Sequence, residues 1–367
     1  MEYEIDFLPV GEGETSGDAI CLRYSSDEGV TWTVGVVDGG TQESGKALVG
    51  HIRKHYDTST VNFLICTHPD KDHASGLSVI MDELQVQQVI MHCPWNYIDD
   101  IWDAVNDGRI TKDSLKQKLI EGHPYAYALY EKANEKSIPI LYPFSDLDLG
   151  LSPLYIAGPS NDFYLNQLVN FRSITDVMDD EVKSEGLLAD FASAVTRAFN
   201  WLTESWENEH LEDPEDDATS AENNSSVISF FNFDGKKVLL TGDAGVPALT
   251  KAADKIEELS SELQNFAFIQ VPHHGSKRNI GPTILDRLVG TTGLFGQNTS
   301  FTAFISASVE GEPKHPNKRV INAFIRRGGK VIATQGRALC QFSSGCPSRG
   351  WSEAQSLPFY DQVEDDD

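Results

Sequence analysis

The sequence predicts an α/β fold in which sheets pack together and helices cover them. Stretches with β character occur in both halves of the chain, and helical stretches separate many of them. Clusters of polar residues also recur where predicted strands end, which is where layered α/β proteins build their sites. We expect one domain over 1–367, with helical insertions at about 94–140 and 161–222.

The first part of the chain alternates strands with helices. Apolar and acidic residues alternate over 2–7, which is typical of a strand with one buried face. An apolar stripe predicts a helix over 43–57, and a buried strand over 61–66 leads into a second helix over about 73–85. Further strands are expected over 17–25, 32–40 and 87–92.

The remaining elements follow two helix-like stretches. Residues 94–140 look helical, and 161–222 lack β signals and become acidic, so we expect helices followed by a mobile linker over about 204–222. Asp234-Gly235 predicts the turn of a hairpin over 226–244. Helices are expected over 246–264, over 281–290 and after 315, and strands over 138–144, 152–158, 266–271, 301–308, 330–335 and 338–343.

The chain is strongly acidic, with a net charge of −27 over 367 residues. This charge opposes the binding of a long nucleic acid duplex, which needs a basic footprint. Basic residues nevertheless occur beside the polar clusters, where they favour an anionic substrate: Lys71, Lys277, Arg278, Lys314, Lys318 and Arg319. No run of 18 apolar residues and no secretory signal is present, and the five cysteines are widely spaced, so we expect no membrane segment and a cytoplasmic protein with reduced thiols.

The stretch THPDKDHASGL, residues 67–77, packs two histidines and two aspartates into six positions directly after a buried strand. Burying such groups without partners would cost several kcal/mol. A loop that caps the next helix, with Asp72 as the N-cap, would explain one aspartate but not the flanking histidines. His51 and His55, which have helical spacing, are interpreted as residues of a solvated helix face.

The segment His68-Pro69-Asp70-Lys71-Asp72-His73 resembles the H-x-H-x-D-H signature of the metallo-β-lactamase fold, with Asp70 in place of the middle histidine. The chain is most similar to the subgroup typified by the hydrolase domain of the competence protein ComEC/Rec2. The resemblance implies an αββα sandwich with helical insertions. Four further motifs of the subgroup are present: Val37-Asp38-Gly39-Gly40, Asn223-Asn224-Ser225-Ser226, Leu239-Leu240-Thr241-Gly242-Asp243 and His273-His274-Gly275-Ser276.

The resemblance implies a dinuclear metal site with two Zn²⁺ or Mn²⁺ ions per chain. Asn223 or Asn224 stands where the family has a further histidine, which shifts the first site toward oxygen ligands and harder ions such as Mn²⁺. The resemblance assigns His68 and Asp70 to the first ion, Asp72, His73 and His315 to the second, and Asp243 as a bridge.

The resemblance also implies roles around the metals. Asp38 would support the site from behind, and His274 or His273 would protonate the leaving group or bind phosphate. Lys277 and Arg278 would add positive charge for a phosphodiester. Asp72, His274, His273 and Asp38 are therefore the expected catalytic residues, and Asn223, Lys277 and Arg278 the expected substrate contacts.

Three functions remain open. The first is a metal-dependent phosphodiesterase or nuclease that acts on a nucleotide or a short nucleic acid. The second keeps the fold but cleaves an ester, thioester or lactam. The third is a catalytically weak subunit that docks onto a protein partner through the helical and acidic insertion.

Overall fold

Two large sheets form the centre of the computed structural model, which describes residues 1–11, 16–105, 108, 110–178, 200–260, 262–297, 300–309, 311 and 315–365. The first sheet has seven strands in the order β16-β1-β2-β3-β5-β7-β8. Its strands are β1 (Glu2–Phe7), β2 (Ala19–Ser25), β3 (Thr33–Gly39), β5 (Phe63–Cys66), β7 (Val89–Met91), β8 (Ile140–Leu141) and β16 (Leu339–Phe342).

The second sheet has six strands in the order β15-β14-β13-β12-β11-β9. In both sheets, antiparallel strands at one side give way to parallel strands at the other. The strands of the second sheet are β9 (Leu154–Gly158), β11 (Ile228–Phe233), β12 (Lys236–Leu240), β13 (Phe266–Gln270), β14 (Phe301–Ile305) and β15 (Gly329–Ala333). Two short ribbons pair β4 (Thr60–Val61) with β6 (Gln85–Val86) and β10 (Asn200–Thr203) with β17 (Gln362–Asp365).

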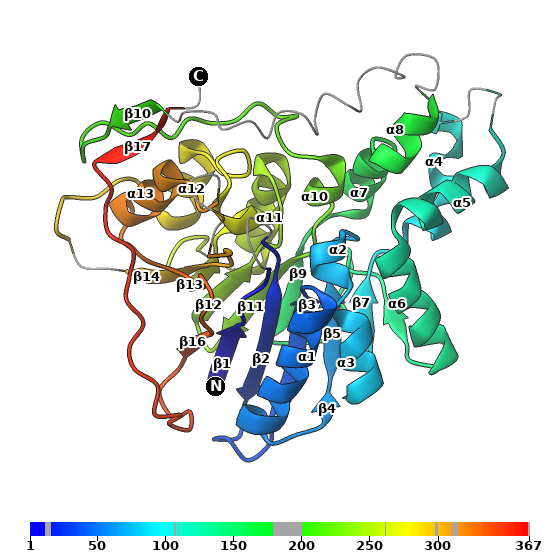
Figure 1. The fold of residues 1–367 in the computed structure, drawn as a ribbon, viewed down its shortest axis with the longest axis horizontal. Helices are drawn as coiled ribbons and strands as arrows, with labels where there is room; N and C mark the ends of the chain where they lie inside the picture. The colour runs from blue at the N-terminus through cyan, green and yellow to red at the C-terminus, as the bar shows by residue number, and fades with distance from the viewer. Residues whose placement is uncertain are drawn as a thin grey trace.

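Helices cover the outer face of each sheet (Figure 1). On the side of the first sheet lie α1 (Gln42–His51), η1 (Ile52–Tyr56), α2 (Lys71–Ala74), α3 (Leu77–Glu83), η2 (Pro94–Asn96), α4 (Ile98–Val105), α5 (Lys112–Gly122), α6 (Pro124–Glu135), α7 (Asn161–Leu168) and α8 (Arg172–Met178). On the side of the second sheet lie α11 (Val246–Leu259), α12 (Pro282–Val289) and α13 (Lys318–Arg326). Two short helices lie beside its strands in the chain: α10 (Ala221–Asn224) precedes β11, and η3 (Pro272–Gly275) follows β13.

Three apolar clusters explain this layering. One lies between the sheets, where Phe7 of β1 packs edge-on against Phe268 and Phe304 of the second sheet, at ring distances of 5.7 and 5.4 Å. A second joins the first sheet to its helices, and the third joins the second sheet to α11, α12 and α13. Apolar residues therefore face both sides of each sheet, and the predicted αββα class is confirmed.

The acidic stretch before β11 is bound to the body of the protein, and not loose as expected for a mobile linker. Glu204 and Arg326 form an ion pair of 2.5 Å in which both side chains are fully buried. Glu209 pairs with Arg327 at 2.8 Å, and Asp213 accepts a hydrogen bond from the backbone N–H of Thr283. Residues 179–199, which hold most of the predicted helical part of this insertion, lie outside the described residues, as does Lys314. One domain over 1–367 stays a prediction.

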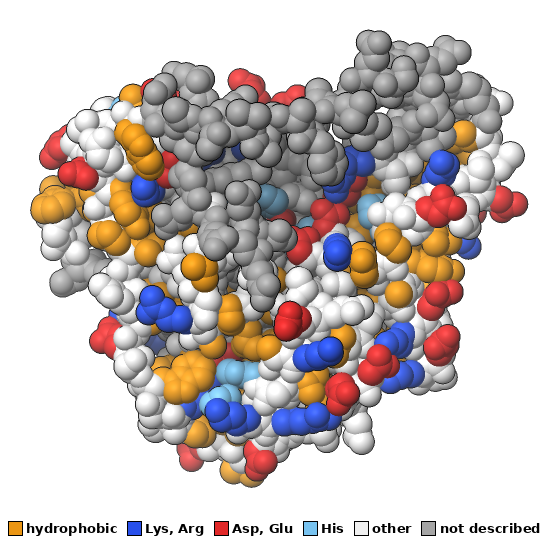
Figure 2. All heavy atoms as spheres, viewed as in Figure 1, with side chains coloured by type: hydrophobic (Ala, Val, Ile, Leu, Met, Phe, Trp, Pro, Cys, Tyr) orange, Lys and Arg blue, Asp and Glu red, His pale blue; other side chains and the backbone are white. Residues whose placement is uncertain are grey.

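The surface of the described residues carries charges of both signs. Figure 2 shows Lys and Arg side chains interspersed with Asp and Glu on the face it draws, without one continuous basic patch. None of the described helices has the length and apolar character needed to cross a bilayer.

Three glycines bring the loop after β5 close to the end of β3. A Cβ atom on Gly76 would overlap the carbonyl oxygen of Gly39, and one on Gly45 would overlap the carbonyl oxygen of Gly76. The backbone N–H of Gly76 donates to the carbonyl of Gly40 at 2.9 Å. This contact of backbone on backbone places α2, with Asp72 and His73, beside Asp38.

Gly76→Ala should therefore lower the free energy of unfolding by roughly 1–3 kcal/mol, because the added methyl group meets backbone that cannot move aside. Gly50→Ala is a matched control, since nothing lies within 4 Å of that position and alanine favours the helix by up to about 1 kcal/mol. Urea denaturation followed by circular dichroism measures both. Equal stability of the two variants would contradict the packing described here.

Candidate metal centre

The candidate site lies where strands of both sheets end. The first sheet contributes Asp38 at the end of β3 and the loop after β5, which holds His68 and His73. The second sheet contributes Asp243 after β12 and the histidine pair after β13. Side chains from both sheets thus converge on one place, as the polar clusters in the sequence predict.

Asp38 is a fully buried residue that orients His73. Its backbone has a φ of 57°, a left-handed conformation that is uncommon outside glycine. Its two carboxylate oxygens accept the Thr67 N–H at 2.8 Å and the Thr67 hydroxyl at 2.6 Å, and Oδ2 also pairs with Nδ1 of His73 at 2.8 Å. With Nδ1–H donated to Asp38, Nε2 of His73 is the nitrogen that faces Asp243, 3.4 Å from its Oδ2.

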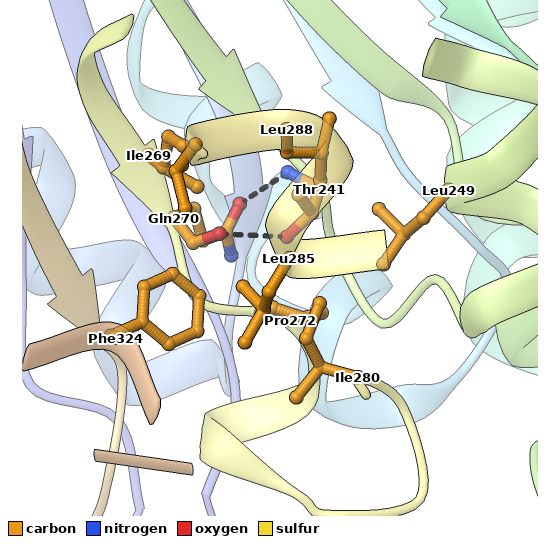
Figure 3. Close-up of a pocket in the computed structure, with 10 residues that line it drawn as sticks. Thr241, Leu249, Ile269, Gln270, Pro272, Ile280, Leu285, Leu288 and Phe324 are labelled. Carbon is orange, nitrogen blue, oxygen red and sulfur yellow. Dashed lines mark hydrogen bonds between the residues drawn. The ribbon is translucent and has the colours of Figure 1, made fainter. Parts of the chain in front are cut away.

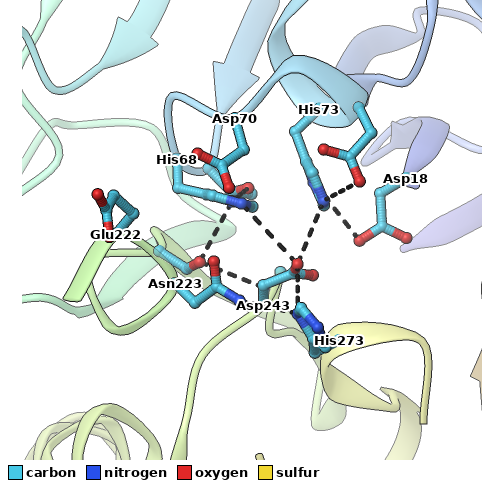
Figure 4. Close-up of polar contacts among 12 residues, drawn as sticks. Asp18, His68, Asp70, His73, Glu222, Asn223, Asp243 and His273 are labelled. Atoms are coloured by element: carbon cyan, nitrogen blue, oxygen red, sulfur yellow. Dashed lines mark hydrogen bonds and ion pairs between the residues drawn. The ribbon is translucent and has the colours of Figure 1, made fainter. Parts of the chain in front are cut away.

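Asp243 is the carboxylate around which the histidines gather (Figure 4). Its Oδ2 lies 2.6 Å from Nδ1 of His273, 3.8 Å from Nε2 of His68 and 3.9 Å from Nε2 of His274. Its own backbone is fixed, since its N–H donates to Ser226 Oγ at 3.2 Å and Asn279 donates to its carbonyl at 2.8 Å. The carboxylate is therefore held between imidazoles from both sheets.

The pKa values at the site reflect this arrangement. Burial favours the neutral form of Asp243, but His273, His73 and His274 outweigh it and hold the pKa of this carboxyl well below its usual range. Burial alone would lower the pKa of His73, but Asp243, Asp38 and Asp72 raise it well above its usual value. Burial lowers the pKa of His68 and of His274, so both imidazoles favour the neutral form that binds metals.

Several buried polar atoms at the site have no hydrogen-bond partner among the described residues: Nε2 of His68, Nε2 of His73, Oδ1 of Asp243 and both ring nitrogens of His274. Leaving them so would cost free energy, because buried polar groups are normally hydrogen-bonded. Imidazole nitrogens and carboxylate oxygens are also the donors that divalent metal ions prefer. Among the described residues, four groups at the site have potential ligand atoms within 4.8 Å of one another: His68 with His73 and Asp243, Asp72 with His73 and His274, Asp18 with Asp243 and His274, and Asp18 with Asp38 and His73. The residues present fit a metal centre.

The structure puts His274, and not His315, in the second group of predicted ligands. His274 joins Asp72 and His73, whereas the ring of His315 lies 6.3 Å from that of His274 and 5.6 Å from that of His273. His273 and His274 have φ values of 45° and 58°, so two consecutive left-handed residues turn both rings toward Asp243. His274 is therefore a further candidate ligand, and the role of His315 as a ligand stays a prediction.

The first group of predicted ligands is less complete. His68 faces Asp243, but the carboxylate of Asp70 pairs with Arg172, and the Nδ2 atom of Asn223 lies 2.9 Å from Nδ1 of His273. Asn224 donates instead to the carbonyl of Thr219 at 3.2 Å. Of the predicted substrate contacts, Lys277 is half-buried and Arg278 is exposed, and both follow η3 directly.

Asp18 is a site residue that sequence reasoning missed. It is buried, its Oδ1 has no hydrogen-bond partner, and it lies with Asp243 and His274 in one group of potential ligands. Burial raises the pKa of its carboxyl. A Gly-Asp pair directly before a strand was the available signal, because it places Asp18 at the same edge of the first sheet as Asp38.

Gln270 connects Asp18 to the turn that carries Asp243. Its Nε2 donates to Oδ2 of Asp18 at 2.7 Å, and its Oε1 accepts the N–H groups of Thr241 and Gly242 at 2.9 and 3.2 Å. Figure 3 shows Gln270 and Thr241 beside a closed, mostly apolar cavity. That cavity has a volume of about 10 Å³, room for one water molecule, so it supports the turn and cannot hold a substrate.

No family model matches the chain. Among curated proteins, the ComE operon protein 3 of Bacillus subtilis (strain 168) is 24% identical over 133 residues, which are 36% of this chain. The matched part is 15% of the length of that protein. The chain is thus a distant homologue of one portion of it, as the resemblance to the ComEC-like subgroup predicts.

Two solved structures are similar to the chain over most of its length, at low sequence identity and low TM-score. Unliganded yeast PDE1 is 11% identical, with a TM-score of 0.41 and coverage of 92% of this chain and 99% of that one. The metallo-β-lactamase SMB-1 bound to 2-mercaptoethanesulfonate is 11% identical, with a TM-score of 0.29 and coverage of 77% and 87%. The chain itself has two sheets packed between layers of helices, with buried histidines and aspartates where strands of both sheets end.

The raised pKa of His73 predicts that metal binding depends on pH. We expect Nε2 of His73 to carry a proton in the metal-free protein, and a metal ion must displace that proton to bind. The affinity for the metal ion should therefore rise by up to roughly tenfold per pH unit until the pH exceeds the raised pKa of His73. At pH values below the ordinary pKa of histidine, the ion pair between His73 and Asp243 should contribute its full stabilisation to the metal-free fold. This stabilisation should be lost as the pH rises through the raised pKa of His73.

Isothermal titration with Zn²⁺ or Mn²⁺ between about pH 6 and about pH 9, in buffers that differ in ionisation enthalpy, would count the released protons. Thermal unfolding of the metal-free protein over the same range tests the stability part. An affinity that does not change with pH would contradict a protonated His73.

Proposed function

We propose that the chain is a metal-dependent hydrolase that cleaves phosphodiester bonds in a nucleotide or a short nucleic acid. The observation that supports this most strongly is the convergence of His68, His73, His274 and Asp243, each of which has at least one buried nitrogen or oxygen without a hydrogen-bond partner among the described residues. Asp72 and His273 stand at the rim of the same site, with 32% and 27% of their side chains exposed. Solvent and substrate therefore have access to a site whose interior is buried.

His68 and Asp70 would hold the first ion, Asp72, His73 and His274 the second, with Asp243 between them and His315 as a further predicted ligand. When bound, divalent ions of this kind lower the pKa of water and offset the negative charge of a phosphodiester transition state. Asp38 keeps Nδ1–H of His73 engaged, so that Nε2 remains directed at the centre. The choice between Zn²⁺ and Mn²⁺ depends on the oxygen donors: Asp72, Asp243 and Asp18 favour a harder ion more than a site of histidines alone would.

His273 is the residue best placed to move a proton. Its Nδ1 is occupied by Asp243 at 2.6 Å, which leaves Nε2 as the atom that can protonate a leaving oxygen. Burial opposes its charged form, but Asp243 outweighs burial and raises the pKa of His273. A proton held at Nε2 near neutral pH is what a general acid requires.

The charge pattern supports a small anionic substrate. Lys277 and Arg278 follow the site histidines directly, and Lys71 lies next to Asp72 in α2. The net charge of −27 and the mixed charges in Figure 2 disfavour a long duplex, which would extend beyond this local group of cations. All five cysteines are free thiols, which fits the proposed cytoplasmic location.

Asp72→Ala should lower the metal content by about one ion per chain and abolish phosphodiester cleavage, because it removes a carboxylate from the group with His73 and His274. Elemental analysis after dialysis gives the metal content. Asp99→Ala, which alters an aspartate with 85% side-chain exposure on α4, is the control and should behave as the wild type. Full metal occupancy and activity in Asp72→Ala would contradict the assigned site.

The substrate class can be tested with bis-p-nitrophenyl phosphate, p-nitrophenyl acetate and a chromogenic β-lactam, each with Zn²⁺ and with Mn²⁺. We expect turnover of the diester under at least one ion, and slower or no turnover of the ester and the lactam. His273→Ala should reduce turnover of the diester more than that of diesters with better leaving groups, since these need less protonation. Ester hydrolysis without diester hydrolysis would reverse the proposal.

A further inference from the structure

Arg172 is a cation fixed beside the candidate metal centre by two carboxylates from different elements. Its Nη2 lies 3.2 and 3.4 Å from the two carboxylate oxygens of Asp70, which precedes α2. Its Nε and its backbone N–H both donate to Oε1 of Glu222 in α10, at 3.0 and 2.8 Å. Arg172 thus joins the element that carries Asp72 and His73 to the element that carries Asn223.

The two carboxylates hold Arg172 unequally. The side chain of Glu222 is 1% exposed, so Arg172 neutralises a charge that is out of contact with water. The side chain of Asp70 is 28% exposed and that of Arg172 is 63% exposed, so their contact lies at the rim of the site. Glu222 therefore anchors the guanidinium, and Asp70 is the partner that can exchange it for another cation.

Asp70 is the predicted ligand that the structure does not direct at Asp243. Among the described residues, the groups of donor atoms that converge within 4.8 Å include His68, Asp72, His73, His274, Asp18, Asp38 and Asp243, but not Asp70. Both oxygens of Asp70 face Arg172 instead. A guanidinium and a divalent ion on the same carboxylate repel each other, so they cannot both be bound there at full strength.

We infer that Arg172 competes with a metal ion for Asp70, so that the ion on the His68 and Asp70 side is held more weakly than the ion on the Asp72, His73 and His274 side. Arg172 is a positioning residue in this scheme, because it acts through Asp70. The inference rests on the dinuclear site of the proposed function. It identifies α8 as the element that sets how much of the protein carries both ions at a given metal concentration.

Titration of Mn²⁺ into the metal-free full-length protein tests the inference, with binding followed by isothermal titration calorimetry. We expect two classes of site in the wild type. Arg172→Gln should tighten the weaker class by roughly three- to tenfold, since an exposed ion pair and a nearby positive charge are both removed, and should leave the tighter class unchanged. Arg172→Lys, which keeps the charge but loses the guanidinium fork, should fall between the two.

Two controls separate competition from a general change in charge. Arg287→Gln removes the same charge from an arginine that also bridges two carboxylates, Asp254 at 2.8 Å and Glu257 at 3.0 Å, and should change neither class. The double variant Arg172→Gln/Glu222→Gln keeps the local net charge and removes the buried carboxylate that Arg172→Gln leaves unpaired. It should retain the tighter binding of the weaker class.

The outcomes distinguish this inference from the proposed function. An unchanged or weaker second class in Arg172→Gln, or a gain that disappears in the double variant, would overturn competition at Asp70 while leaving the metal centre in place. If Arg172→Gln does not fold, as circular dichroism would show, the lysine and double variants decide by the same criterion. A wild-type protein that binds neither Mn²⁺ nor Zn²⁺ would overturn the proposed function itself.

Discussion

The carboxylate of Asp243 lies where the edges of the two sheets meet, and imidazoles from both sheets surround it. His68 and His73 approach from the loop after β5, and His273 and His274 approach from the turn after β13. A buried carboxylate is stable only if nearby positive or hydrogen-bonding groups offset its loss of solvent. The packing of the two sheets therefore brings together the imidazoles that stabilise the buried carboxylate of Asp243.

The positions of these groups are set by backbone conformations that residues with side chains adopt rarely. Asp38, His273 and His274 all have φ values between 45° and 58°, and each costs free energy that the surrounding structure must supply. The close packing of Gly39, Gly45 and Gly76, and the bonds from Gln270 to Thr241 and Gly242, hold these turns in place. Three of the nine described non-glycine residues with positive φ therefore lie at the candidate site, where the interior beneath them stabilises their conformation.

Some of the site can be predicted from sequence because it is local. The loop from His68 to His73 follows a recognisable strand, Asp38 lies at the end of β3, and Asp243 follows β12. All three are therefore at the ends of strands, where a site is expected. Asp18 directly precedes β2 and so offered the same local signal, whereas its hydrogen bond with Gln270, 252 residues away, has no local signal in the sequence. His274 lies in a group of candidate ligands because of left-handed turns that the residue types alone do not specify. The site residues as a set stay a prediction until metal binding is measured.

The contacts made by the two insertions also could not be predicted from local sequence patterns. The fold class follows from alternating patterns within each element, whereas Arg172 reaches Asp70 across 102 residues and Glu222 across 50. Composition alone suggested that the acidic stretch after residue 203 is a loose linker, yet Glu204, Glu209 and Asp213 are each bound to described residues of the second half. Glu222, at the end of the same stretch, contacts Arg172 beside the candidate metal centre. Part of the excess negative charge of this protein is therefore paired within the structure, and one such pair holds Arg172 beside the candidate metal centre.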